Sequence, residues 1–130
     1  MVDARLNRAD LSNTDLTKSK FDGSTLTNVT MTDALCHETH MPRVTLTGSH
    51  LIRVSFVKAV LQSSQLDRIT ASNVDFSDAR LAGMNFADSE LTAVKFAGAD
   101  LRAANFTNTT LSDVDFTGAV LSSKYCIFCP

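Results

Sequence analysis

The chain has 130 residues, 44% of them hydrophobic, and a formal net charge of −2 from 12 basic and 14 acidic residues. This length accommodates one domain, and the even charge balance indicates neither a polyanion-binding surface nor an acidic tail. No apolar run reaches the ~18–20 residues of a membrane-spanning helix, and the N-terminus lacks the apolar core of a signal peptide. With three cysteines, an odd number, we expect a cytoplasmic protein in a reducing compartment.

A period of five residues begins near the N-terminus. Every fifth position from Leu6 to Leu121 gives 24 residues, of which thirteen are Leu and seven are Phe. The other four are Met31, Cys36, Met41 and Ala71. Two residues before each central position the side chain is small or β-branched, with Met84 as the exception. All five glycines fall two residues after a central position, where four asparagines also occur.

Neither the helical period of about 3.6 nor the strand period of 2 explains this pattern. We expect the small and the central residue to point inward, the residue between them to point outward, and the last two to turn a corner. Gly and Asn suit a corner that needs a positive φ. Four corners close a square, so about twenty residues form one coil and residues 1–123 form about six coils. The predicted inward columns are Leu16, Cys36, Phe56, Phe76, Phe96 and Phe116 on one wall, and Phe21, Met41, Leu61, Leu81, Leu101 and Leu121 on the next.

Units such as residues 99–103 (ADLRA) and 104–108 (ANFTN) resemble the A(D/N)LxX consensus of the pentapeptide-repeat family. The resemblance covers residues 4–121 without a slip of register. It implies an all-β fold, the right-handed quadrilateral β-helix. The handedness is an expectation taken from the family.

Between about residues 29 and 71 the outward positions depart from this consensus. Stacking by twenty places His37 next to Val57 and His40 next to Val60 in neighbouring coils, with Leu35 beside them and Ile52 around the previous corner. A contiguous exposed apolar patch is typical of a contact site. The predicted partner-binding residues are Leu35, His37, His40, Ile52, Val57 and Val60.

The sequence offers no catalytic constellation, and we expect neither an enzyme nor a cofactor. His50 falls on a different wall from His37 and His40, so the three imidazoles do not converge on one metal. Cys36 occupies an inward position, where a thiol behaves as a small hydrophobic group. Seven of the eight Phe are inward and there is no basic stripe, so direct nucleic-acid binding is not expected.

Residues 124–130 form a short apolar tail that could fold over the last coil as a plug. Its residues Tyr125, Ile127 and Phe128 are the predicted dimer contacts, because a solenoid end exposes apolar core unless it is capped. Cys126 and Cys129 form a C-x-x-C, which is compatible with half a zinc site, a redox pair or a strained disulfide. No further metal ligands lie nearby, and burial within the plug is the favoured interpretation.

Three functions fit these observations. The first is a non-catalytic interaction or scaffolding module with an unidentified protein partner, forming a homodimer through an end of the rod. The second comes from the family resemblance: some members mimic DNA, bind DNA gyrase and protect against quinolones or toxins. The third is a small metal or redox protein that uses Cys126 and Cys129. Entry in mid-pattern at Met1 also allows a longer parent chain.

Overall fold

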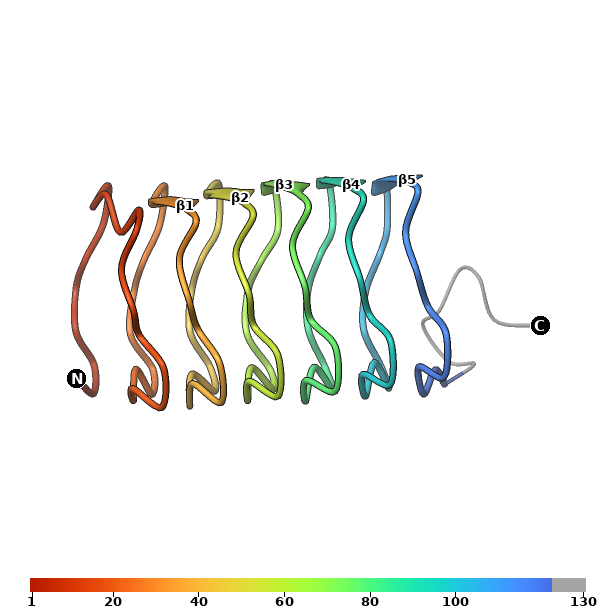
Figure 1. Ribbon diagram of the computed structural model, residues 1–130, viewed down its shortest axis with the longest axis horizontal. Coiled ribbons are helices and arrows are strands. Elements are labelled where there is room, and N and C mark those ends of the chain that lie inside the picture. Colours follow the sequence, from red (N-terminus) through yellow and green to blue (C-terminus); the bar gives the residue numbers. More distant parts are fainter. Residues whose placement is uncertain (123–130) are drawn as a thin grey trace.

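The chain folds as a parallel β-solenoid, which the computed structural model describes for residues 1–122. Five short strands follow one another along one side of the rod (Figure 1). They are β1 (Thr30–Thr32), β2 (His50–Ile52), β3 (Thr70–Ser72), β4 (Glu90–Thr92) and β5 (Thr110–Ser112). Each strand pairs in parallel with the next, and partners are twenty residues apart, as in Met31 with Leu51.

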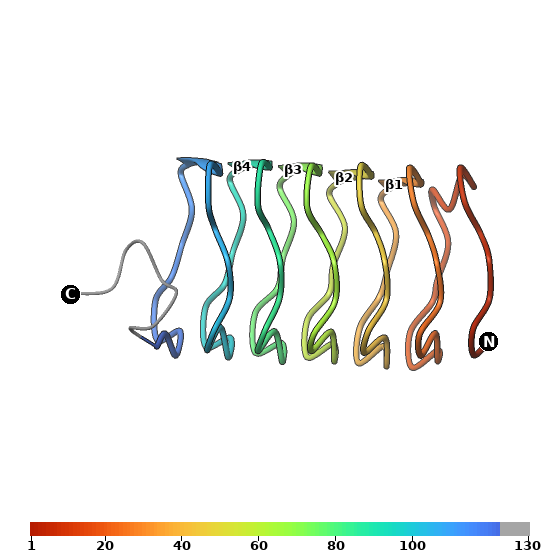
Figure 2. The same ribbon diagram turned by 180° about the vertical axis from the view of Figure 1, so that it is seen from behind.

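The same twenty-residue step recurs on three further sides of the coil. Isolated parallel bridges run from Arg5 with Thr25 to Asp100 with Val120, and they occur at every fifth residue rather than only in the strands. The chain therefore completes four circuits between β1 and β5, one from each strand to the next. The bridges continue the same register before β1 and after β5. Seen from behind, the coils of residues 1–122 follow one another without an inserted loop (Figure 2). The predicted all-β, four-sided architecture is confirmed.

Every corner has a left-handed backbone conformation. The residue at each fifth position from Asp3 to Gly118 has a positive φ between 52° and 73°. The sequence predicted this for glycine and asparagine, but Arg, Lys, Asp, Glu, Ser and Ala adopt it too. Each such residue costs roughly 1–2 kcal/mol relative to a right-handed conformation. Backbone bonds to the next coil offset this cost, such as the 2.9 Å bond from Arg53 N to Ser72 O.

We name the four walls by their side chains. In chain order they are the sheet wall, the phenylalanine wall, the leucine wall and the amide wall. The sheet wall carries β1–β5, and the inward residues of the phenylalanine wall are Leu16, Cys36, Phe56, Phe76, Phe96 and Phe116. Those of the leucine wall are Phe21, Met41, Leu61, Leu81, Leu101 and Leu121, and those of the amide wall are Leu6, Leu26, Leu46, Leu66, Phe86 and Phe106. The central residues of the middle coils are fully buried. The two predicted inward columns are therefore confirmed.

Aromatic stacking dominates the C-terminal half of the core. Along the phenylalanine wall, the rings of Phe56, Phe76, Phe96 and Phe116 stack nearly parallel at centroid distances of 5.1, 5.3 and 5.3 Å. Phe86 and Phe106 stack on the opposite wall at 5.1 Å. The two columns meet edge-on in the centre at 5.6–6.0 Å, both arrangements that aromatic rings favour.

Buried serines link successive coils inside the rod, an arrangement we call the serine clasp. The Ser49 hydroxyl accepts a hydrogen bond from Val29 N at 3.1 Å and donates to Leu26 O at 3.2 Å. Ser24, Ser64 and Ser89 make equivalent pairs of bonds. The small inward position thus also satisfies backbone groups that would otherwise be buried without partners.

The part of the chain that the structure describes contains no helix long and apolar enough to cross a membrane.

Candidate interaction surface

Numbering the coils in steps of twenty residues from the N-terminus, the second coil is residues 21–40 and the third is residues 41–60. Three of the predicted contact residues lie together on the outer face of the phenylalanine wall in these two coils. Leu35 is 45% exposed and is bridged to Asp15 on one side and Ser55 on the other. His37 follows it on the same wall, and its Nε2 atom lies 2.6 Å from Ser55 Oγ. Val57 stacks over His37 and is half-buried. Leu35, His37 and Val57 are therefore neighbours by register on one wall, and we call these three residues the strip.

His40 and Val60 lie around the next corner, on the leucine wall. They are bridge partners, with His40 exposed and Val60 half-buried. Asp22 Oδ1 is buried from solvent and lies 2.6 Å from His40 Nδ1, which is an ion-pair distance when the imidazole is protonated. The corner residues Glu38 and Lys58 separate this pair from Leu35, His37 and Val57.

Ile52 lies around the opposite corner, at the end of β2 on the sheet wall, and is 36% exposed. An ion pair occupies this corner: Arg53 Nε and Nη2 each donate to a carboxylate oxygen of Asp33 at 2.7 Å. The hydrogen bond lowers the pKa of the Asp33 carboxyl and raises the pKa of the Arg53 guanidinium. Side chains from three walls therefore contribute to the predicted patch, and charged corners divide it.

The two corner columns that border the phenylalanine wall carry acidic and basic residues in neighbouring coils. The corner before the wall stacks Asn13, Asp33, Arg53 and Asn73, and the corner after it stacks Lys18, Glu38, Lys58 and Asp78. These four residues of the second column are exposed, and none of them belongs to an ion pair within the described residues. A shallow hollow beside it is lined by Glu38, Lys58, Val60, Asp78 and Arg80.

Other candidate chemistry is not assembled in residues 1–122. No group of three or more His, Cys, Asp or Glu side chains is placed to hold a metal ion there. His50 lies in β2 on the sheet wall, apart from His37 and His40. Burial raises the pKa of the Cys36 thiol to about 12, so it remains protonated and unreactive near neutral pH. The predicted tail residues Tyr125, Cys126, Ile127, Phe128 and Cys129 lie outside the described residues.

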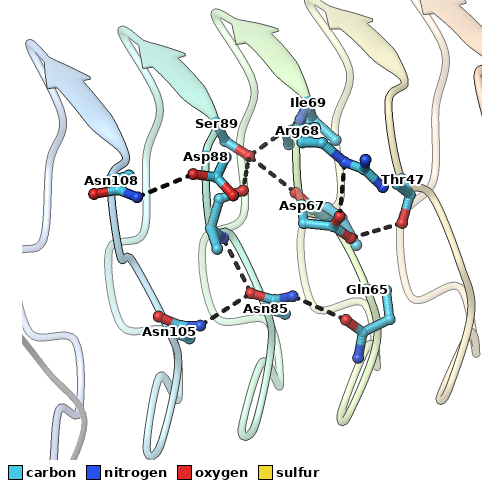
Figure 3. Close-up of polar contacts among 12 residues, drawn as sticks. Thr47, Gln65, Asp67, Arg68, Ile69, Asn85, Asp88, Ser89, Asn105 and Asn108 are labelled. Atoms are coloured by element: carbon cyan, nitrogen blue, oxygen red, sulfur yellow. Dashed lines mark hydrogen bonds and ion pairs between the residues drawn. The ribbon is translucent and has the colours of Figure 1, made fainter.

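Sequence reasoning missed a ladder of side-chain amides on the outer face of the amide wall (Figure 3). Asn85 Nδ2 donates to Gln65 Oε1 at 2.9 Å, and Asn105 Nδ2 donates to Asn85 Oδ1 at 3.2 Å. The signal was present, because amide residues recur at intervals of twenty in one outward position. These bonds run along the rod and leave this wall polar and internally paired.

Several solved structures align with most of this chain at low sequence identity. QnrB1, a plasmid-mediated fluoroquinolone resistance protein, is 18% identical with a TM-score of 0.43, covering 94% of this chain and 74% of QnrB1. A pentapeptide repeat protein from the Arabidopsis thaliana thylakoid lumen is 22% identical with a TM-score of 0.38, covering 85% of this chain and 70% of that protein. HetL, a pentapeptide repeat protein involved in heterocyst differentiation regulation in Nostoc, is 12% identical with a TM-score of 0.29, covering 92% of this chain and 90% of HetL. No curated protein matches the sequence.

Two family profiles match the sequence itself. The profile described as "Pentapeptide repeats (8 copies)" matches residues 2–33, and the profile described as "Pentapeptide repeat region" matches residues 49–123. Residues 34–48, between the two matches, hold Leu35, His37 and His40. The second match alone covers more than half of the chain, so the chain belongs to the pentapeptide-repeat family.

Proposed function

We propose that the chain is a non-catalytic protein-interaction module whose contact surface is centred on the strip formed by Leu35, His37 and Val57. The observation that carries this proposal is the 45% exposure of Leu35 on a wall whose bridged neighbours in the same column, Asp15 and Ser55, are polar. An exposed aliphatic group beside a second apolar residue and an imidazole is typical of a contact site.

The scaffold suits this role because it is pre-organised. Backbone bonds connect each coil in the middle of the rod to both neighbours, as Leu35 N bonds to Thr14 O at 2.9 Å and Cys36 N bonds to Ser55 O at 2.7 Å. A rigid surface loses little conformational entropy when a partner binds. The outward side chains can therefore change without disturbing the rod that presents them.

The test replaces the apolar strip while keeping its shape. In a Leu35→Thr and Val57→Thr double variant, we expect binding to a partner recovered by proximity labelling and then purified to weaken about tenfold or more. Stability should change little, because these side chains contribute few core contacts. The matched control is Val120→Thr, which alters a 51% exposed valine far from the strip and should leave binding unchanged. Equal affinity of the double variant and the native chain would contradict the proposal.

A second candidate is DNA-mimicking binding to DNA gyrase. The observation that favours it is the charge of residues 66–130, which carry eight acidic and five basic residues. A supercoiling assay with and without a quinolone tests it directly. Protection of gyrase would support this candidate, whereas unaltered supercoiling and unaltered quinolone inhibition would oppose it.

A further inference from the structure

We propose that the partner of the phenylalanine wall is a second copy of the chain, packed antiparallel about a two-fold axis that passes between the second and third coils. This inference rests on the proposed function, because it names the occupant of the same surface. It is independent of the dimer through the rod end that the sequence suggested.

The charges of the two corner columns are self-complementary under this symmetry. Asp33 and Glu38 border the wall in the second coil, and Arg53 and Lys58 border it in the third. A two-fold axis between these coils places each second-coil residue opposite the third-coil residue of the same column. Asp33 then faces Arg53 of the partner subunit, and Glu38 faces Lys58 of the partner subunit. One coil further out, Lys18 faces Asp78 of the partner subunit.

The centre of the same contact is apolar or neutral. Leu35 faces Ser55 of the partner subunit, and His37 faces Val57 of the partner subunit. The two copies of Leu35 lie diagonally across the axis, one coil apart. An apolar centre bordered by complementary charges is the usual arrangement of a protein–protein interface.

The charges also select the orientation. In a parallel dimer each coil would meet its own copy with the corners exchanged, so Asp33 would face Glu38 of the partner subunit and Arg53 would face Lys58 of the partner subunit. Both are repulsive pairs. The antiparallel arrangement therefore has complementary charges where the parallel one has like charges.

The charges select the register as well. If the axis passed through the third coil, Lys58 would meet its own copy and Glu38 would face Asp78 of the partner subunit. If the axis lay between the third and fourth coils, Lys58 would face Asp78 of the partner subunit. This would be the one pair of oppositely charged corner residues in that register. The register between the second and third coils gives three kinds of complementary pair. In one of them, the Asp33 and Arg53 side chains are also paired within each chain.

One pair opposes the contact and limits its strength. Asp15 faces Asp75 of the partner subunit, and these carboxylates already accept hydrogen bonds from Thr17 N and Ser77 N at 3.0 and 2.9 Å. Four coils spaced by ~4.8 Å make a contact roughly 20 Å long and one wall wide. This is smaller than a standard interface, so we expect a weak dimer at concentrations of about 100 μM and above.

The experiment is a charge exchange followed by sedimentation equilibrium at low salt on the full chain. Glu38→Lys and Lys58→Glu should each weaken dimerisation about tenfold, because each creates two like-charged pairs across the axis. The double exchange should restore dimerisation to within about threefold of the native chain, because the pairs then reappear with reversed signs. Asp75→Asn should tighten the dimer. Lys95→Glu, one coil outside the contact, is the control and should change it less than twofold.

Each outcome bears on the proposal. A dimer that ignores the Glu38 and Lys58 exchanges but disappears when residues 124–130 are deleted would place the interface at the rod end and overturn it. A monomer at all concentrations up to about 1 mM would also overturn it. If the chain is monomeric but binds a different protein through Leu35 and Val57, the proposed function still holds. If it neither dimerises nor binds another protein through these residues, both proposals are rejected. Circular dichroism of each variant verifies that the fold is unchanged.

Discussion

Residues 29–60 and residues 79–118 build the same backbone with different side chains. Both segments pair in parallel at intervals of twenty and have a positive φ at every fifth residue. In the first segment the buried central residues include Met31, Cys36 and Met41, whereas in the second they include Phe86, Phe96 and Phe106. The corners and backbone bonds are thus the same in both, although the side chains that fill the interior differ.

The outer surfaces of the two segments also differ. The first segment exposes Leu35 and Ile52, and its corners bring acid and base together around them. The second carries several polar groups that pair with one another, such as Asn85 with Asn105 and Arg102 with Asp100. This contrast indicates that one backbone scaffold can present paired polar side chains in one part and exposed apolar side chains in another.

The largest expected effect tests how much the Phe-rich core of residues 79–118 contributes to the free energy of unfolding. Phe96 contacts four other phenylalanine rings, and Phe96→Ala should cost about 3–5 kcal/mol of unfolding free energy by opening a cavity. Cys36→Ala, in the same column, removes one sulfur and should cost about 1 kcal/mol. Urea denaturation measures both. A loss below about 1 kcal/mol for Phe96→Ala would contradict the stabilisation expected from the stacked rings.

The next effect concerns the serine clasp, which the first segment uses at Ser49. Ser49→Ala should cost about 1–3 kcal/mol, because Val29 N and Leu26 O each lose a buried partner. Ser112→Ala on the exposed face of β5 is the control and should stay within about 0.5 kcal/mol. Thermal unfolding of both variants checks this, and a Ser49 variant as stable as its control would mean that water satisfies these groups.

The smallest effect tests whether the corners are equivalent in the two segments. Gly48 and Gly98 have positive φ values of 73° and 68°, and a Cβ at either would meet a side-chain oxygen of the previous coil, from Asn28 or Asp78. Replacing either glycine with Ala should cost about 1 kcal/mol. Gly118→Ala lacks the close contact and should cost a few tenths less. Unequal costs at Gly48 and Gly98 would show that the corners differ after all.

Much of the fold could be predicted from the sequence because the five-residue repeat keeps the same register along the chain. The inward columns and the corner glycines lie at fixed offsets, so a single stacking interval of twenty places Phe56, Phe76 and Phe96 in contact. The serine clasp escaped this reasoning, since the pattern marks Ser49 as small and inward but does not show where its hydroxyl points. A hydrogen bond between coils depends on rotamers that periodicity does not specify.

The candidate surface was predicted less completely. The sequence placed Leu35, His37 and Val57 on one wall, and the structure agrees. It did not indicate that Val57 and Val60 are only half-buried rather than exposed, or that Asp33 and Arg53 stand between Ile52 and Leu35. Those features depend on how far each corner side chain extends, which depends on its pairing with the coil above or below.

The twenty-residue register has a consequence for how such a chain can change length. Removing one whole coil from the middle would join two coils that already match, and each remaining side chain would keep its wall. Removing a single five-residue unit would leave the corners intact but rotate everything downstream by a quarter turn, so that Phe-bearing units would stack on the wrong column. Length variants that differ by complete coils should therefore keep the core and the wall of every remaining side chain, whereas those that differ by one unit should disrupt both.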